Sequence, residues 1–188
     1  EREFPDPQGL PGQADLASLV RLMASRRSCR VYDDRPVERG QLEDLVRIGI
    51  TAPSGTNCQA WTFTILPDKE ALLALGQGVA GFFKRLNRLA RLPLLRQSLR
   101  LVGKPELADY HREFYHTVKT ALDEWEATGR DRLFHGAAAA IVVGSRPGAS
   151  CPAEDALLAT GHMLLAAQAM GLATCLIGYA VEAMVRDK

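Results

Sequence analysis

The spacing of apolar residues in the first third of the chain predicts two amphipathic helices. The first begins after Asp15, a suitable N-cap, and ends near Arg26, and its apolar face comprises Leu16, Leu19, Val20 and Met23. The second has an apolar face that comprises Leu42, Leu45, Val46 and Gly49. Pro53 and Gly55 then stop this helix, because proline opposes helix continuation and glycine frees the backbone.

Three short segments have the β-branched and apolar composition of strands. They are TFTIL at 62–66, AAIVVGS at 139–145 and TCLIGY at 174–179, and residues 29–32 are also extended. From 68 to 128 the pattern is mostly helical, interrupted by glycines and prolines. Because helices and strands are interspersed, with too few strands for repeated βαβ units, we expect an α+β layer architecture.

Residues 154–170 form a helix of a different kind, which is apolar almost all the way round. Such a helix is normally buried on every side. Its many alanines and glycines would let another helix approach closely, and Gly171 is suited to end it.

The composition is that of an ordinary globular protein. The chain has 188 residues, enough for one domain with a sizeable core, of which 47% are apolar and 24% charged. A formal net charge of +1 argues against bulk attraction to nucleic acid or to an anionic membrane. No apolar run approaches the length of a spanning helix and no signal peptide is visible, so we expect a cytoplasmic protein.

Both ends of the sequence indicate that it is part of a longer chain. It begins with Glu rather than Met, and residues 1–13 are rich in Pro and Gly, as in a linker. The last residues, VEAMVRDK, resemble the start of a helix. We therefore expect a linker-like segment at 1–13 and one domain at 14–188 whose C-terminal part lies outside this sequence.

Two conspicuous motifs are more simply explained without a ligand. GQGVAG at 76–81 matches the dinucleotide-binding pattern G-x-G-x-x-G, but it follows a helical segment rather than a strand, so we expect a flexible joint between helices. The run from Phe82 to Lys104 carries seven basic residues and no acidic one. It suits a helix that docks on a membrane surface or a partner, or a lid helix with a solvated charged face, and we favour the solvated face.

The cysteines and histidines form no recognisable metal or hydrolase site. The four cysteines are widely spaced without a CxxC pair, so buried reduced thiols are the simpler interpretation. The histidines lack an H-E-x-x-H pattern, and no G-x-S-x-G elbow marks a nucleophile. Metal-dependent and hydrolytic chemistry therefore rank low.

Two polar segments are suited, together, to hold a phosphorylated ring compound. The first offers guanidinium groups and a hydroxyl, which bind phosphate, on Arg26, Arg27, Ser28 and Arg30. A solvated basic face would have the same composition. The second, PSGTNCQAW at 53–61, offers hydroxyl, amide and aromatic groups to a polar heterocycle without an acid or base. The pair indicates phosphate at one end of a ligand and a ring at the other.

These segments resemble, in order, motifs of the nitroreductase family of FMN-dependent oxidoreductases. RRSCRVYDDRPV at 26–37 is similar to the family's R-R-S-x-R-x-[FY] opening, and APSGTNCQAW at 52–61 to its A-P-S-[SG]-x-N-x-Q-P-W loop. EDALLATGHMLLAAQAMGLATCLIGY at 154–179 is similar to a later stretch that begins D-x-x-x-A. The resemblance implies a three-layer fold in which helices flank a mostly antiparallel sheet, and an intertwined dimer.

The resemblance also implies roles for the matching residues. The FMN phosphate, ribityl chain and pyrimidine edge would be contacted by Arg26, Arg27, Ser28 and Arg30. The partner subunit would contribute a loop that contains Pro53, Ser54, Gly55 and Asn57. The isoalloxazine ring would meet the backbone of Leu176, Ile177 and Gly178. The helix at 154–170 would be the central dimer helix. Because the cofactor carries the chemistry, we assign no catalytic acid or base and no metal.

The chain departs from the family pattern at three places. Ala60 replaces the usual proline of the loop, which relaxes the loop without removing a contact. Ile177 stands where the bacterial enzymes that reduce nitroaromatics have an acidic residue, so their substrate range is not implied. The family's C-terminal strand, with its basic residues for the phosphate, lies outside this sequence.

The linker-like N-terminus, a helical insert at about 76–130 and GRDRLFHGAAAAIVVGS at 129–145 resemble the branch in which a two-cluster ferredoxin-like domain precedes the flavin domain. The family implies a homodimer that passes electrons or hydride by a ping-pong cycle from NAD(P)H or reduced ferredoxin to a small acceptor such as a nitroaromatic or quinone. The alternatives are reductive dehalogenation, azoline oxidation or flavin degradation on the same fold, and a non-catalytic FMN-binding module.

Overall fold

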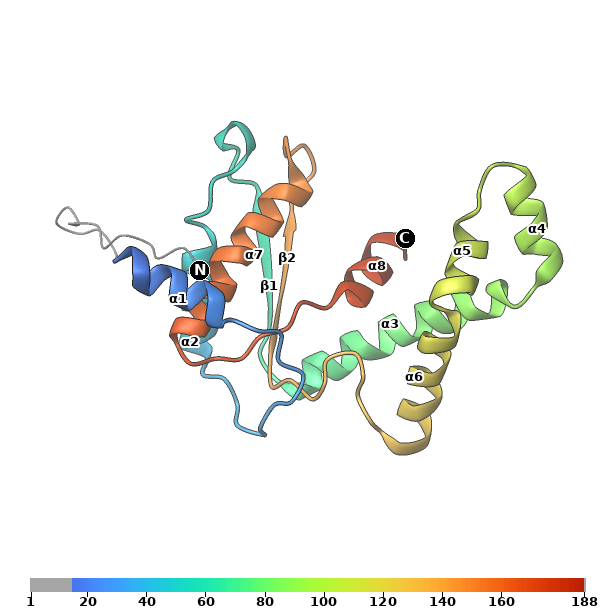
Figure 1. Ribbon diagram of the computed structural model, residues 1–188, viewed down its shortest axis with the longest axis horizontal. Coiled ribbons are helices and arrows are strands. Elements are labelled where there is room, and N and C mark those ends of the chain that lie inside the picture. The colour runs from blue at the N-terminus through green and yellow to red at the C-terminus, as the bar shows by residue number, and fades with distance from the viewer. Residues whose placement is uncertain (1–14, 188) are drawn as a thin grey trace. The chain divides into compact units, whose positions relative to one another are not determined.

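The computed structural model describes residues 15–187, which divide into two compact units (Figure 1). Of the described residues, the first unit comprises 15–67 together with Ala138–Leu176, and the second comprises Asp68–Ala137 together with 177–187. The linker-like segment expected at 1–13 lies outside the described residues. Within 15–187, no helix has both the length and the apolar character needed to cross a membrane.

The first unit combines helices with a two-stranded antiparallel sheet (Figure 1). Its elements are α1 (Leu16–Ser25), α2 (Arg39–Gly49), the 3-10 turn η1 (Gly55–Asn57), β1 (Trp61–Leu66), β2 (Ala140–Ser145) and α7 (Pro152–Ala169). The predicted N-cap of α1 is confirmed, because the Asp15 carboxylate accepts hydrogen bonds from the main-chain N–H groups of Ala17 and Ser18.

The core of the first unit lies where α2 and α7 pack against this sheet. In the pairing of β1 with β2, Phe63 lies opposite Val143, and side chains alternate between the two faces of each strand. Phe63 and Val143 pack against Leu45 of α2 and Met163 of α7. The backbone of α2 lies so close to α7 at Gly49 that a Cβ atom on this residue would be 3.0 Å from the sulfur of Met163. This packing fixes α7 along the sheet.

The second unit is helical. It contains α3 (Lys69–Ala90), α4 (Pro93–Leu101), α5 (Glu106–Glu113), α6 (Tyr115–Thr128) and α8 (Gly178–Arg186). Phe83 of α3 meets the ring of Tyr179 edge-on at 5.8 Å and stacks on Tyr110 at 6.3 Å. The Tyr110 hydroxyl donates a hydrogen bond of 2.7 Å to the buried amide oxygen of Asn87. These aromatic contacts join α3, α5 and α8.

The flexible joint predicted at 76–81 is wrong. α3 runs without interruption through Gly76, Gly78 and Gly81. Glycine weakens a helix interior, but burial of Val79 and Ala80 on the inner face of α3 supplies the compensating free energy. The matching glycines are therefore positions inside one helix.

The strand predicted at 174–179 is also wrong. Thr174 forms one parallel bridge with Ser28, and α8 already begins at Gly178. Strand-like composition reflects how well a side chain fits a half-buried surface more than an intrinsic backbone preference. The other predicted strands are confirmed as β1 and β2, and so is the α+β class.

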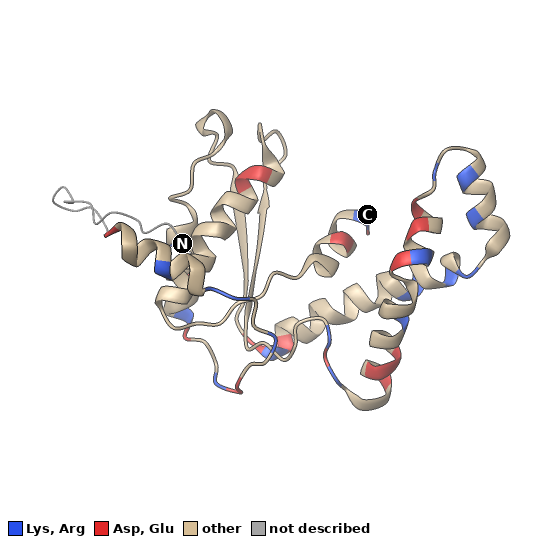
Figure 2. Cartoon of the chain, viewed as in Figure 1, with Lys and Arg blue, Asp and Glu red and all other residues tan. Residues whose placement is uncertain are grey.

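The basic run from Phe82 to Lys104 spans two helices. α3 ends at Ala90, and α4 begins at Pro93, because proline is favoured in the first turn of a helix. Figure 2 shows Lys or Arg but no Asp or Glu on α4. Leu94 and Leu101, one heptad apart on this helix, are 80% and 82% exposed. The face that they share is therefore open to solvent in the single chain.

Candidate functional site

The arginine-rich segment begins where α1 ends. Arg26 is the C-cap residue of α1 and is half-buried, and the Arg27 guanidinium donates to the main-chain oxygen of Ala24 at 2.6 Å. Arg30 is exposed. Within residues 15–187, Arg26 and Arg30 form no ion pair, and Arg27 is bonded only to main-chain oxygens. These cations are therefore available to an anionic ligand.

A main-chain bridge brings this segment beside the third motif. Ser28 pairs with Thr174, and the Cys29 N–H donates to the Thr174 carbonyl at 2.9 Å. The Tyr32 hydroxyl in turn donates to the Cys29 carbonyl at 2.9 Å. Burial raises the pKa of Tyr32 to about 12, so the hydroxyl keeps its proton at neutral pH. The fold thus brings together two segments of the predicted site that lie about 145 residues apart in the sequence.

The remaining predicted residues of the third motif follow this bridge. Leu176 is 58% exposed and is the last residue of the first unit. Ile177 is the N-cap of α8 and Gly178 its first residue. The first main-chain N–H groups of any helix lack intrahelical partners, so the start of α8 can donate to a polar ligand atom.

The polar loop forms a tight, internally bonded turn. The Ser54 hydroxyl accepts the N–H of Gln59 at 3.0 Å, and the Gln59 amide donates to the Asn57 side-chain oxygen at 3.1 Å. Pro53 and Asn57 are exposed, whereas Ser54 and Gly55 are half-buried. The loop therefore offers polar groups without an acid or base, as its sequence predicts.

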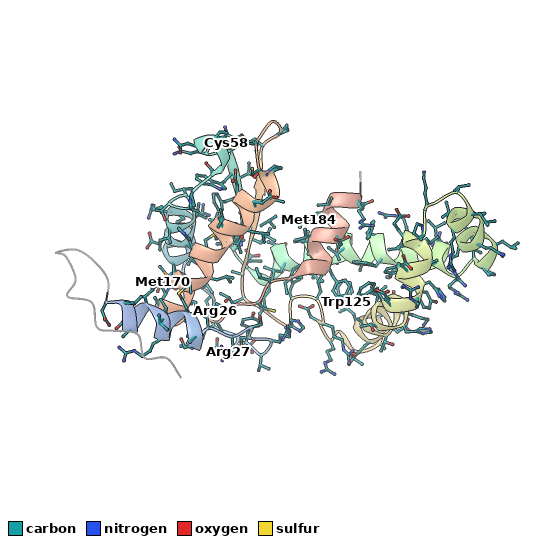
Figure 3. All side chains as sticks on the ribbon, turned by 45° about the horizontal axis from the view of Figure 1, so that its top comes forward. Arg26, Arg27, Cys58, Trp125, Met170 and Met184 are labelled. Atoms are coloured by element: carbon teal, nitrogen blue, oxygen red, sulfur yellow. The ribbon has the colours of Figure 1, made fainter. Side chains whose placement is uncertain are left out.

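The two halves of the predicted site lie near opposite ends of α7. The Gly55 N–H bonds to Asp155 in the first turn of α7, whereas Ser25, next to Arg26, accepts a long hydrogen bond from Gln168 in its last turn. Figure 3 shows the same separation, with Cys58 near one end of the helix and Arg26 near the other. At about 1.5 Å per residue, the 13 steps along the helix from Asp155 to Gln168 span about 20 Å. One chain alone does not bring the halves together.

Two residues that contact the loop were missed by the sequence interpretation. Asp155 is 2% exposed and its carboxylate accepts the Gly55 N–H at 2.8 Å. The Ser150 hydroxyl lies 2.7 Å from the hydroxyl of Thr56. The available signal for Asp155 was its match to the first position of the family motif D-x-x-x-A, but the motif does not say what the carboxylate contacts, and an acid in the first turn of a helix is explained equally well by the helix dipole. Nothing in the sequence distinguishes Ser150 from an ordinary turn serine.

The fold and site define an α+β protein whose cations and polar loop suit a phosphorylated ring compound. A model of the nitroreductase family matches residues 23–187. Since that match covers most of the chain, this protein belongs to the nitroreductase family.

Individual relatives agree with this family. Iodotyrosine deiodinase of Thermotoga neapolitana is 26% identical over 160 residues, which are 84% of this chain and 72% of that protein. An Archaeoglobus fulgidus protein provisionally named NADH dehydrogenase/NAD(P)H nitroreductase is 31% identical over 62 residues, 33% of this chain and 36% of that protein. The chain thus aligns with about a third of the length of the first curated relatives that it matches.

The crystal structure of a nitroreductase with bound FMN from Desulfitobacterium hafniense has the same fold. It superposes with a TM-score of 0.60 at 26% sequence identity and covers 90% of this chain and 74% of that one. The predicted nitroreductase-like fold is thereby confirmed, whereas the residue roles at the site stay predictions.

Proposed function

We propose that this chain is the FMN-binding part of an oxidoreductase. The observation that carries the proposal is the Ser28–Thr174 bridge, which sets three arginines beside the segment that leads into α8; among residues 15–187 these arginines have no anionic partner. A phosphate dianion fits guanidinium forks and a hydroxyl, and an uncharged ring fits a loop without acid or base. The relative from D. hafniense binds FMN by its name, which supports the same cofactor here.

In this proposal the protein binds and orients, and bound FMN supplies the redox chemistry. Arg26, Arg27, Ser28 and Arg30 hold the phosphate, ribityl chain and pyrimidine edge. The main-chain N–H groups at Leu176, Ile177 and Gly178 donate to the ring edge. Their positive environment also favours extra negative charge on the ring. No side chain acts as catalytic acid or base.

A second copy of the chain completes the site. The loop residues Pro53, Ser54, Gly55 and Asn57 lie near the far end of α7 from Arg26, so a partner's loop is the simplest source of the missing contacts. α7 has an exposed apolar surface suited to such pairing, since its residues Leu157 and Leu158 are 66% and 46% exposed. Closed two-fold dimers are the commonest assemblies of identical chains.

Electrons pass from NAD(P)H or a ferredoxin-like donor to a small acceptor such as a nitroaromatic or a quinone. The provisional name of the A. fulgidus relative supports NAD(P)H as donor. Such donors are found in the cytoplasm, where we place the protein. We expect a ping-pong cycle, in which donor and acceptor would bind the same site in turn.

Reductive dehalogenation is the second candidate. It is favoured by the alignment with T. neapolitana iodotyrosine deiodinase, which covers 84% of this chain. Ile177 stands where nitroaromatic-reducing enzymes carry an acidic residue, so the sequence does not imply a nitroaromatic as the acceptor. Product analysis with a nitroaromatic and an iodinated phenol separates the two activities.

The direct test is to purify the chain, add FMN and measure the flavin spectrum and stoichiometry, then follow oxidation of NADPH or reduced ferredoxin with each acceptor. We expect one FMN per chain and steady turnover. Protein that stays colourless after reconstitution would refute the proposal. Flavin binding without turnover with any donor would instead indicate a non-catalytic FMN-binding module.

A further inference from the structure

The loop from Ser54 to Gln59 is held in an unfavourable backbone conformation. Thr56, Asn57 and Gln59 have φ angles of 52°, 53° and 49°. This left-handed region is uncommon for residues other than glycine, and for a β-branched residue such as Thr56 it is a true outlier. Such geometry persists only where the surroundings over-determine it, and it gathers at functional sites. The loop therefore needs an external anchor.

Asp155 provides that anchor from the first turn of α7. One oxygen of its carboxylate accepts the Gly55 N–H at 2.8 Å, and the other lies 3.5 Å from the Cys58 thiol, which donates to it. Its main-chain carbonyl accepts the indole N–H of Trp61 at 3.2 Å. One residue thus holds Gly55 and Cys58 of the loop and also Trp61, the first residue of β1, near the position labelled Cys58 in Figure 3.

The residues before Asp155 form a platform for the same turn. The Ser150 hydroxyl lies 2.7 Å from that of Thr56. A Cβ atom on Gly55 would lie 2.9 Å from the sulfur of Cys151, so the backbone of the loop rests directly on the start of α7. The strained turn is therefore supported both by hydrogen bonds and by contact.

The surroundings make Asp155 unusual for a core residue. It is almost completely buried in an apolar helix, where a carboxylate is unfavourable unless donors and dipoles compensate it. The compensation comes from the loop's own N–H and S–H groups and from the positive end of α7. A hydrophobic residue would satisfy the core equally well, but it could not hold the loop.

We infer that Asp155 is a positioning residue for the cofactor: it fixes the loop that contains Pro53, Ser54, Gly55 and Asn57 in the shape that meets the flavin ring. Asp155 itself does not touch the ligand, because Gly55 and Cys58 cover its carboxylate. The inference rests on the proposed function, since contact between this loop and FMN is part of that proposal.

Replacing Asp155 tests this role in the full chain. Asp155→Ala leaves the half-buried Gly55 N–H without its acceptor, and we expect FMN affinity to fall by about ten- to a hundredfold. Asp155→Asn keeps one oxygen for Gly55 and should lie between that variant and the wild type. Glu154→Ala is the matched control, because Glu154 is an exposed acid in the same helical turn. It should bind FMN as the wild type does. Flavin fluorescence quenching gives the dissociation constants.

A second readout does not depend on flavin. Amide exchange at Gly55, followed by NMR in the apo protein, should be at least about ten times faster in Asp155→Ala and unchanged in Glu154→Ala. A Thr56→Gly change in the Asp155→Ala background relieves the left-handed strain, so it should recover several-fold of the lost affinity. A residue that acts only on global stability would show no such recovery.

The outcomes distinguish a failure of the positioning role of Asp155 from a failure of the proposed FMN-binding function. Wild-type affinity in Asp155→Ala, or fast Gly55 exchange without loss of affinity, would overturn the positioning role. If Asp155→Ala unfolds globally, the affinity and Gly55 exchange of Asp155→Asn decide in its place. If the wild type binds no FMN, the proposed function fails, and Gly55 exchange alone decides whether Asp155 holds the loop.

Discussion

Gly55 lies where the loop crosses the start of α7, and a side chain there has no room. Its Cβ atom would lie 2.9 Å from the sulfur and 3.1 Å from the Cβ of Cys151. We expect Gly55→Ala to lower the free energy of unfolding by about 1–3 kcal/mol, since the loop must move away from its platform. Urea unfolding followed by Trp fluorescence measures the change.

The control for this substitution is Gly40→Ala. Gly40 lies exposed in the first turns of α2, and no atom lies within 4 Å of its would-be Cβ. Alanine favours a helix over glycine, so this variant should gain up to about 1 kcal/mol. Equal effects of the two substitutions would contradict the close approach at Gly55.

Tyr32 should make stability depend on alkaline pH. Burial, then Cys175 and Cys29, raise its pKa to about 12, above the value of about 10 in an unfolded chain. The folded state therefore keeps the proton longer, and this stabilisation is complete below about pH 10 and lost as the pH rises towards 12. In Tyr32→Phe, the decline of the urea midpoint between about pH 10 and 12 should be shallower than in the wild type. If the decline is the same in both proteins, the alkaline loss of stability comes from titratable groups other than Tyr32.

Residue types at the candidate site were predictable to a limited extent. The arginines and the polar loop could be selected because guanidinium and amide groups have a distinctive ligand chemistry. Asp155 matches the first position of the D-x-x-x-A motif, but its role could not be predicted, because that role depends on burial and on a hydrogen bond to a residue 100 positions away. The positive φ of Thr56 was equally hidden, since a β-branched residue gives no local indication of left-handed backbone.

At the scale of elements, a substitution in α3 tests whether this helix is continuous through its glycines. Gly78 lies in its interior and no atom lies within 4 Å of its would-be Cβ. In a continuous helix, Gly78→Ala should raise the free energy of unfolding by about 0.5–1 kcal/mol. Thermal unfolding measured by circular dichroism reports the change. Loss of stability or of helicity would instead favour a joint at this position.

Elements with a clear apolar period were predicted within a few residues. α1, α2, β1, β2 and α7 all fall near their expected ranges, because their periodicity records a buried face. The two errors have one origin. Whether 76–81 bends and whether 174–179 joins a sheet depend on partners distant in sequence, namely the residues packed on α3 and the lone bridge to Ser28.

At the scale of the whole molecule, the separation along α7 predicts complementation between two defective chains. An Arg26→Ala, Ser28→Ala chain lacks the phosphate end, and a Gly55→Ala chain lacks the loop. If each site takes one half from each copy, a mixed dimer has one intact site. Random exchange of subunits should therefore restore roughly a quarter of the wild-type FMN sites.

The mixing experiment is read by flavin titration after subunit exchange at equal concentrations of the two variants. Each variant alone, taken through the same exchange, is the control. A mixture that binds no more FMN than the average of its parents would place both halves of the site within one chain, against the distance set by α7.

If the site is shared between two copies as proposed, the position of its two halves at opposite ends of α7 ties cofactor retention to protein concentration. If only the assembled pair offers a complete site, FMN binds the dimer and not the separated chains, and by mass action each stabilises the other. Dilution should then release flavin at a threshold set by the dimer, and excess FMN should lower that threshold. The yellow colour of a dilute solution would report how much of the protein is still paired.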